Sequence, residues 1–256
     1  MHVLILGGTR DAMNLADLLL AAPQFTATYS LAGRTRRPLP AALPTRRGGF
    51  GGVSGLQQWL SAHHVAAVVD ATHPFAAQMS AHALQACRAL GLPLVRFGRE
   101  PWVAGDGDNW QHCASLSAAA QRLISHGQPG QRILLATGGS TLHHFDHIHD
   151  RHFAVRCVDP PQPPPRFSSW SLIEDRGPFQ LDDERRLLRE QRIDTIVCKN
   201  SGGKAAQAKL LAARELGIEV IMVERPDIAP ADAELFDSPS VLQWLQTRLA
   251  TALSSQ

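Results

Sequence analysis

The sequence predicts an α/β fold with two doubly wound parallel sheets. Strand-like and helix-like segments alternate along the 256 residues, which is typical of parallel sheets covered by helices on both faces. Several apolar strands run into a helix through a short, glycine-containing or polar turn. The alternation is interrupted around residues 99–109 by Pro, Gly and Asp, and one or two domains fit this chain length. We therefore expect two domains, residues 1–98 and 99–256.

The first domain begins with a buried strand at residues 3–6. A helix is expected at residues 12–21, because Leu15, Leu18 and Leu19 share one face at helical spacing. Pro74 suits the first turn of a later helix, where its missing N–H has no consequence. The other elements predicted here are strands at 27–31, 45–47, 66–70 and 92–97 and helices at 56–63 and 74–90.

The second domain repeats the alternation. Val241, Leu245 and Leu249 lie on one side of a closing amphipathic helix at residues 239–250. The proline-rich residues 159–166 are typical of a stiff loop. The other elements predicted here are strands at 132–136, 153–158, 195–198 and 219–223, helices at 116–126, 182–191 and 203–216, and a turn at 137–140 that leads into a short helix.

Composition excludes several classes of protein. With 44% hydrophobic and 19% charged residues, the chain is no disordered protein. No apolar run reaches the ~18 residues that span a bilayer, and no Lys or Arg precedes the first apolar stretch, so we expect no signal peptide and a cytoplasmic location. Four widely spaced cysteines without a Cys-x-x-Cys pair indicate reduced core thiols. They are Cys87, Cys113, Cys157 and Cys198.

Charge is unevenly distributed, although the formal net charge is only +2. No acidic residue lies between Asp17 and Asp70, a stretch that contains five arginines. The only lysines are Lys199, Lys204 and Lys209. Such a cluster is either a solvated helix face or an anion site that uses compact ammonium groups. The intervening Asn-Ser-Gly-Gly favours the anion site.

A glycine turn after the first strand resembles a dinucleotide-binding fingerprint. In the pattern G-x-G-x-x-G/A, Gly7 matches the first position and Ala12 the last, but Thr9 replaces the middle glycine. Gly7 and Gly8 permit the turn, Thr9 can cap the helix that follows, and free N–H groups there form an anion site. The turn alone also suits any doubly wound protein.

The end of the second strand favours NADP over NAD. NAD sites usually carry Asp or Glu at this point, whereas this chain continues with Gly33, Arg34 and Thr35. A guanidinium and a hydroxyl suit the extra phosphate of NADP, and the alternative is a basic surface loop. The glycine-rich residues 48–52, with Gly51, form another loop where a ligand can approach the backbone.

Several chemistries are excluded by missing motifs. The only tyrosine, Tyr29, is not followed four residues later by Lys, which excludes the short-chain dehydrogenase pair. Neither a hydrolase G-x-S-x-G elbow nor a G-x-x-x-x-G-K-[ST] phosphate loop occurs. His143 and His147 have the spacing of a metal pair, but their segment lacks the H-E-x-x-H pattern. We therefore interpret the histidines of residues 143–152 as solvated and predict no metal site.

Two further strand ends carry polar groups. Thr72 and His73 follow a buried strand and precede a helix, where a doubly wound fold has its ligand crevice. His73 either contacts a cofactor or substrate or caps that helix. Residues 199–204 again join a strand to a helix and offer N–H groups, a hydroxyl and two ammonium groups, which suits phosphate or carboxylate.

Taken together, these motifs resemble the precorrin-6A reductase family of cobalamin biosynthesis over nearly the whole chain. The resemblance depends on several blocks in the right order. They are residues 5–9, 48–52, 70–76, 99–102, 199–203, 209–217 and 225–226.

The resemblance implies two Rossmann-like domains that face each other across an interdomain cleft. NADPH lies on the first domain and a corrin precursor, a polycarboxylate tetrapyrrole, in the cleft. A hydride passes to one ring carbon and a proton to its neighbour. For the cofactor we expect Gly7, Gly8, Thr9, Arg10, Gly33, Arg34, Thr35, Gly51, Thr72 and His73; for the substrate we expect Arg99, Trp102, Lys199, Asn200, Ser201, Gly202, Gly203 and Lys204.

His73 and Lys199 are the candidate proton donors, with bound water as a rival. Two alternatives to the reductase stay open: a non-catalytic NADP- or ligand-binding module, and an NADP-linked reductase of another polycarboxylate. We expect neither nucleic acid nor membrane as a partner, and a monomer or small homo-oligomer.

Overall fold

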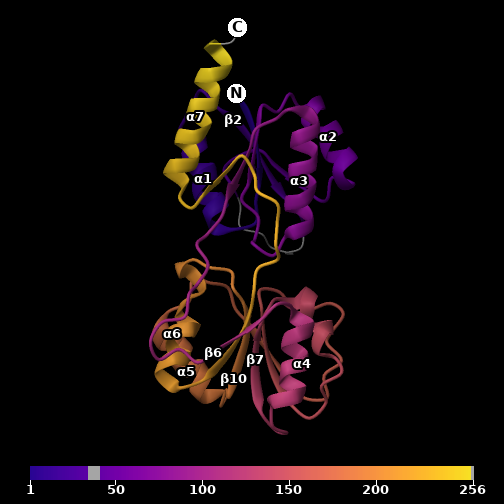
Figure 1. Ribbon diagram of the computed structural model, residues 1–256, viewed down its shortest axis with the longest axis vertical. Coiled ribbons are helices and arrows are strands. Elements are labelled where there is room, and N and C mark those ends of the chain that lie inside the picture. Colours follow the sequence, from indigo (N-terminus) through magenta and orange to yellow (C-terminus); the bar gives the residue numbers. More distant parts are fainter. Residues whose placement is uncertain (34–40, 255–256) are drawn as a thin grey trace. The chain divides into compact units, whose positions relative to one another are not determined.

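The computed structural model describes residues 1–33 and 41–254 and forms two compact units (Figure 1). Unit 1 comprises Met1–Glu100 and Asp227–Gln256, and unit 2 comprises Pro101–Pro226. The expected second domain at 99–256 therefore needs correction, because its last thirty residues return to unit 1. They do so because strand β12 (Ala233–Leu235) pairs in parallel with β5 (Leu94–Phe97).

Unit 1 contains a six-stranded sheet in the order β12-β5-β4-β1-β2-β3, and every pairing in it is parallel. The chain leaves β1 toward β2 and β3 on one side and returns to β4 and β5 on the other. This is the doubly wound order, with its switch point between β1 and β4. The other strands are β1 His2–Leu6, β2 Thr26–Leu31, β3 Thr45–Arg47 and β4 Ala67–Asp70.

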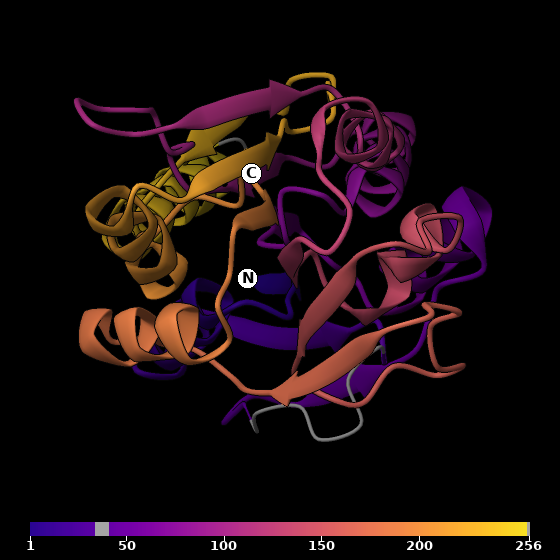
Figure 2. The same cartoon turned by 90° about the horizontal axis from the view of Figure 1, so that it is seen from below.

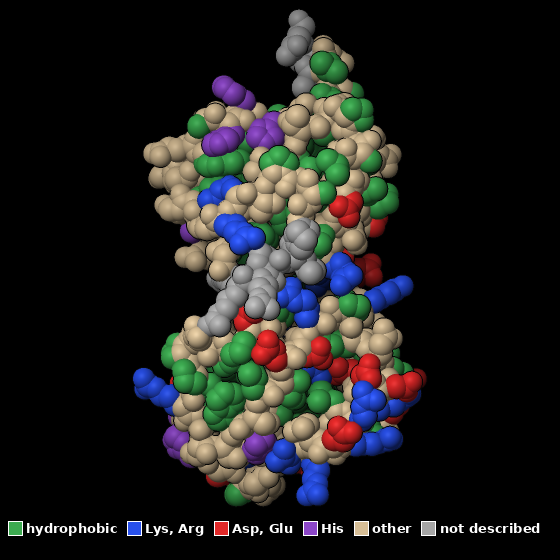
Figure 3. All heavy atoms as spheres, turned by 180° about the vertical axis from the view of Figure 1, so that it is seen from behind, with side chains coloured by type: hydrophobic (Ala, Val, Ile, Leu, Met, Phe, Trp, Pro, Cys, Tyr) green, Lys and Arg blue, Asp and Glu red, His purple; other side chains and the backbone are tan. Residues whose placement is uncertain are grey.

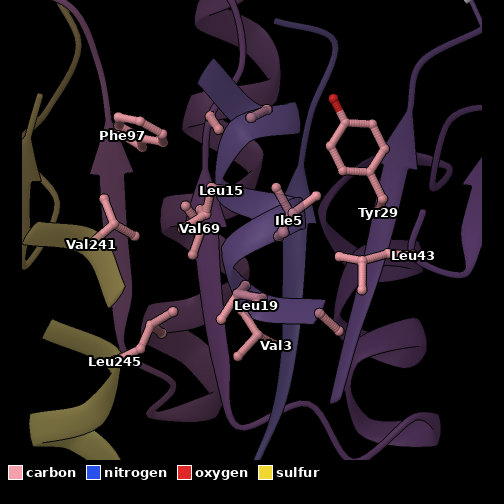
Figure 4. Packing of buried hydrophobic residues seen from close by; sticks show 14 of the residues in the cluster. Val3, Ile5, Leu15, Leu19, Tyr29, Leu43, Val69, Phe97, Val241 and Leu245 are labelled. Carbon is pink, nitrogen blue, oxygen red and sulfur yellow. The ribbon is translucent and has the colours of Figure 1, made fainter. Parts of the chain in front are cut away.

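Helices cover both faces of this sheet (Figure 1). Helices α1 (Arg10–Leu20) and α7 (Ser238–Ser254) pack together on one face, and α2 (Gly52–Ala62) and α3 (Ala77–Leu90) on the other. The face under α1 and α7 is packed with apolar side chains (Figure 4). They include Val3, Ile5, Leu15, Leu19, Tyr29, Val69, Phe97, Val241 and Leu245, all at most 4% exposed.

Unit 2 contains a second parallel sheet in the order β6-β11-β10-β7-β8-β9. Its switch point lies between β7 and β10. Helix α4 lies on one side of the sheet and α5 and α6 on the other (Figures 1 and 2). The elements are β6 Trp110–Cys113, α4 Leu116–His126, β7 Arg132–Ala136, η1 Gly139–Phe145, β8 His152–Cys157, β9 Trp170–Glu174, α5 Leu181–Glu190, β10 Thr195–Lys199, η2 Lys204–Ala206, α6 Ala208–Leu216 and β11 Glu219–Val223.

Several predicted helices differ from the observed ones at their ends, and α2 begins at Gly52 rather than at residue 56. Helix α3 begins at Ala77 rather than at Pro74, because the N–H groups of Phe75 and Ala76 bond back to His73 in a separate turn. The helix predicted at 203–216 is divided into η2 and α6 at Gln207. Three short edge strands, β6, β9 and β12, were not predicted.

Charged side chains in unit 2 occupy two different environments. Charges of both signs gather on the surface over α5 (Figure 3), where Arg186 pairs with Asp183. Beneath the surface, Arg156 and Glu184 form a bidentate ion pair, with Nη1–Oε1 at 2.8 Å and Nη2–Oε2 at 3.0 Å. Their side chains are only 5% and 3% exposed. The described helices include none that is long and apolar enough to cross a membrane.

Candidate functional site

Unit 1 has a cavity of about 690 Å³ at the carboxyl ends of its central strands. It lies beside the switch point between β1 and β4, where doubly wound sheets bind their ligands. Backbone and apolar groups line it, and the polar side chains come from the ends of β3, β4 and α3. The lining residues are Gly7, Gly8, Leu31, Ala32, Gly33, Arg47, Gly49, Phe50, Gly51, Gly52, Thr72, His73, Phe75, Ala76, Ala77, Gln78, Met79 and His82.

The glycine turn after β1 is shaped by Tyr29. The backbone N–H of Gly8, whose φ is +112°, donates to the Tyr29 hydroxyl at 3.0 Å. A Cβ on Gly7 would lie 2.3 Å from the Tyr29 ring, so only glycine fits above this side chain. Burial raises the pKa of Tyr29, which therefore remains a neutral phenol at the base of the turn. Figure 4 shows its hydroxyl at the end of the packed face.

Thr9 fixes the beginning of α1. Its hydroxyl accepts from the Ala12 N–H at 3.1 Å and donates to the Ala71 carbonyl at 3.0 Å, which links the turn to the end of β4. The capping role predicted for Thr9 is therefore confirmed. Arg99 bonds Asp11 in the first turn of α1, from Nε to Oδ2 at 2.5 Å, and this pairing neutralises a carboxylate near the helix N-terminus.

The glycine-rich loop after β3 leaves its backbone open. Gly48, Gly51 and Gly52 have φ between +81° and +104°, a region that favours glycine. The φ of Gly49 lies outside this region, and a Cβ built on Gly49 meets no atom within 4 Å. Neither backbone conformation nor packing within the described chain therefore requires glycine at position 49, which suits the approach of a ligand to this loop.

The end of β4 presents Thr72 and His73 to the same cavity. Buried Asp70 accepts from the Thr72 N–H at 3.2 Å and from the Thr72 hydroxyl at 2.7 Å, so the turn is rigid. His73 Nδ1 accepts from the Phe75 N–H at 3.2 Å. This bond leaves the proton of a neutral ring on Nε2. His73 therefore caps the turn and lines the cavity at once.

Most of the predicted cofactor residues meet at this cavity. Gly7, Gly8, Gly33, Gly51, Thr72 and His73 line it, whereas Thr9 and Arg10 do not. Arg34 and Thr35 lie outside the described residues. Sequence reasoning missed Gln78 and His82, whose spacing of four residues places them on one face of α3, and it missed Arg47, which ends β3.

The lysine-bearing residues 199–204 lie at the switch point of the second sheet. Lys199 ends β10, and its Nζ donates to the carbonyl of Thr137, which follows β7, at 2.7 Å. Both Gly202 and Gly203 have positive φ. Burial lowers the pKa of His144, and the nearby charges of His143 and Lys199 lower it further.

Two predicted substrate residues are enclosed by protein groups beneath this loop. The side chain of Asn200, 2% exposed, accepts from the Trp102 N–H at 2.8 Å and donates to the Trp102 carbonyl at 3.0 Å. The Trp102 indole donates to the Gly203 carbonyl at 3.0 Å, and Lys209 lies over its ring at 4.6 Å. Burial lowers the pKa of Lys209. Asn200 and Trp102 therefore hold the loop from below.

No metal centre is evident in the part of the chain that the structure describes. No group of three or more His, Cys, Asp or Glu side chains lies close enough there to hold an ion. In the histidine-rich segment, the tilted rings of His143 and His144 have centroids 4.2 Å apart, and His144 also bonds Ser117 at 3.1 Å.

Known proteins match this chain over almost its entire length. The family model described as Precorrin-6x reductase CbiJ/CobK matches residues 2–246. The precorrin-6A reductase of Rhodobacter capsulatus is 44% identical over 250 residues, which cover 98% of each chain. That of Rhodococcus erythropolis is 43% identical over 248 residues, 96% of this chain and 98% of its own.

A more distant relative and a solved structure extend the comparison. The cobalt-precorrin-6A reductase of Methanothermobacter thermautotrophicus is 31% identical over 242 residues, 89% of this chain and 78% of its own. The structure titled "CobK precorrin-6A reductase" is 43% identical, with a TM-score of 0.89 and 97% of each chain covered. The fold with two doubly wound α/β units is thereby confirmed, and the chain belongs to the precorrin-6x reductase family, oxidoreductases of cobalamin biosynthesis.

Proposed function

We propose that this chain reduces precorrin-6A with NADPH as the electron donor. Family membership decides for a reductase over a non-catalytic binding module. The observation that carries the choice of cofactor is the cavity at the switch point of unit 1, which is lined by the glycine turn and by the ends of β2 and β4. A dinucleotide is the ligand that such a crevice typically binds.

The cobalt-free substrate is favoured over its cobalt complex. Two relatives that share 43–44% of their residues with this chain are named precorrin-6A reductases. The relative named a cobalt-precorrin-6A reductase shares only 31%. Since the nearer names agree, we assign the metal-free macrocycle as the preferred substrate.

The residues of unit 1 fit a dinucleotide. Backbone N–H groups at the start of α1 suit its pyrophosphate, and Arg99 offsets the carboxylate of Asp11 there. The apolar ends of β2 and of the glycine-rich loop suit the adenosine. NADPH, when bound, supplies the hydride that reduces one conjugated double bond of the ring, with a proton added to the neighbouring atom.

His73 is the candidate proton donor in unit 1. Its Nδ1 accepts from the Phe75 N–H, which keeps the neutral ring oriented with Nε2–H as its donor, and the ring transfers a proton from its imidazolium form. The Phe75 bond thus sets both the tautomer and the direction of the ring. Exchange of His73 for Gln retains a hydrogen-bonding group but removes the transferable proton, and should reduce turnover more than NADPH affinity.

Lys199 and its loop bind carboxylates of the macrocycle in this proposal. The loop offers two ammonium groups, and Asn200 and Trp102 keep its backbone fixed. Charge-assisted bonds to carboxylates are strong and directional. Lys199 is a rival to His73 as the proton donor.

The function is tested by mixing the purified protein with precorrin-6A and NADPH in the absence of oxygen. We expect loss of NADPH absorbance in proportion to the macrocycle reduced, and a lower rate with cobalt-precorrin-6A. Controls omit the macrocycle or replace NADPH by NADH. No loss of NADPH with either macrocycle would contradict the proposed reaction.

Replacement of Lys199 or Lys204 by Ala should raise the KM for precorrin-6A about ten-fold or more in at least one variant. The affinity for NADPH should stay unchanged, and added salt should partly mimic the loss, because exposed charges are screened over ~8–10 Å. Arg186→Ala, which removes an exposed pair with Asp183, is the matched control. A normal KM in the Lys199→Ala/Lys204→Ala variant would remove this loop from the substrate site.

A further inference from the structure

Two consecutive arginines end β3, and the structure gives them different environments. Adjacent residues of a strand point to opposite faces of the sheet. Arg46 is partly buried and Arg47 is exposed. Only Arg47 lines the cavity of unit 1.

Arg46 is bonded to the protein through both Nη atoms. Its Nη1 donates to Ser30 Oγ at 2.8 Å and to the Gly48 carbonyl at 3.0 Å, and its Nη2 donates to the Gly49 carbonyl at 3.0 Å. Its guanidinium carbon lies 3.7 Å from the centroid of the Phe50 ring. Arg46 therefore holds the glycine-rich loop in shape, and three of its five N–H donors are already bonded to the protein.

Arg47 is available to a ligand. Within the described residues, no ion pair or side-chain hydrogen bond engages its guanidinium, although it lines a cavity built largely of backbone and apolar groups. None of the described residues that line this cavity is Asp or Glu. A guanidinium in that position has five N–H donors, and no carboxylate among the described lining residues accepts them.

The place of Arg47 in the sheet identifies the ligand group. Leu31, at the end of β2, is the register partner of Arg47, and the Gly48 N–H continues this pairing with a bond to the Leu31 carbonyl at 2.9 Å. In a doubly wound sheet, the end of the second strand lies at the adenosine ribose of a bound dinucleotide. A carboxylate there selects NAD, and an arginine accommodates the 2′-phosphate of NADP.

We propose that Arg47 binds the 2′-phosphate of NADPH and so determines cofactor specificity, while Arg46 acts only as a positioning residue for the loop. This inference rests on the proposed use of NADPH. It distinguishes two neighbouring arginines by the partners that each already has. A guanidinium binds phosphate through two parallel N–H···O bonds, a geometry that lysine cannot reproduce.

The experiment measures binding of NADP⁺, NAD⁺ and adenosine 2′,5′-bisphosphate by calorimetry, without the macrocycle. Arg47→Gln should weaken the binding of NADP⁺ and of the bisphosphate about ten- to hundred-fold, as expected for loss of charge-assisted bonds. Its affinity for NAD⁺ should change less than about two-fold, so the preference for NADP⁺ collapses. Arg47→Lys should retain only part of the preference for NADP⁺.

Arg46→Gln is the matched control. It should weaken the binding of NADP⁺ and of NAD⁺ by the same factor. A displaced loop affects contacts to the dinucleotide that both cofactors have in common. Thermal unfolding of each variant establishes that it is folded, and Arg34→Gln tests the other basic segment near this strand end.

The outcomes separate this inference from the proposed function. Equal affinities of the wild-type protein for NADP⁺ and NAD⁺ would contradict the proposed cofactor itself. A wild-type preference that persists in Arg47→Gln would overturn the role of Arg47 and leave the cofactor assignment intact. If Arg34→Gln loses the preference for NADP⁺ and Arg47→Gln keeps it, the residues after β2, rather than Arg47, bind the 2′-phosphate.

Discussion

The Glu184→Leu variant is expected to lose about 3–5 kcal/mol of unfolding free energy, because it leaves the Arg156 guanidinium buried without its counter-charge. Both side chains are at most 5% exposed and share two hydrogen bonds. Leucine approximates the volume of glutamate, so the loss reports the unpaired charge rather than a cavity. Denaturant unfolding followed by the fluorescence of Trp102, Trp110 and Trp170 in unit 2 measures it.

A double variant makes this test specific. Arg156→Met together with Glu184→Leu removes both charges and should restore most of the stability, since apolar replacement of a whole buried pair is often neutral or better. The surface pair provides the control: Asp183→Asn should cost no more than ~1 kcal/mol. A double variant as unstable as Glu184→Leu would show that packing, rather than charge, governs this position.

Gly7→Ala is expected to destabilise unit 1 by about 1–3 kcal/mol, the usual cost of an extra methyl group in a packed core. The new Cβ would lie 2.3 Å from the ring of Tyr29, which is 1% exposed and has no room to move. Displacement of the turn should also weaken NADPH binding about ten-fold, which corresponds to ~1.4 kcal/mol of lost interaction. Thermal unfolding and calorimetry measure the two effects.

Two further variants separate crowding from ligand contact. In a Tyr29→Leu background the ring is gone, so Gly7→Ala should cost less stability than it does in the wild-type protein. Gly49→Ala meets no protein atom within 4 Å and should leave stability unchanged while it weakens NADPH binding. If Gly49→Ala binds NADPH normally, the open loop backbone does not contact the cofactor.

The alternation of strands and helices was predictable, and the sheet edges were not. Buried strands such as β4 begin with a run of apolar residues, which the sequence displays directly. The missed strands β6, β9 and β12 are three to five residues long and partly exposed. Their residues alternate too briefly to give a period, and the pairing partners of β6 and β12 lie far away in the sequence. β12 pairs with a strand that precedes it by more than a hundred residues.

The position of the candidate site was predictable in outline, but which of its residues face the cavity and which support other residues was not. Glycine turns at strand ends have a sequence signature, and most of them line the cavity. Trp102 and Asn200 resemble ligand-binding residues in the sequence, yet each is the hydrogen-bonding partner of the other. Arg46 and Arg47 are chemically identical neighbours, and only the orientation of β3 determines which one meets the cavity.

The return of the chain to unit 1 has a consequence for the order of events during synthesis. Domains generally fold as units while they emerge from the ribosome, the first one first. Here unit 2 is complete once residue 226 has emerged, whereas unit 1 still lacks β12 and α7. The nascent first hundred residues therefore present an unpaired edge at β5 and an uncovered apolar face where Val241 and Leu245 later pack. The unit that is begun first is completed last.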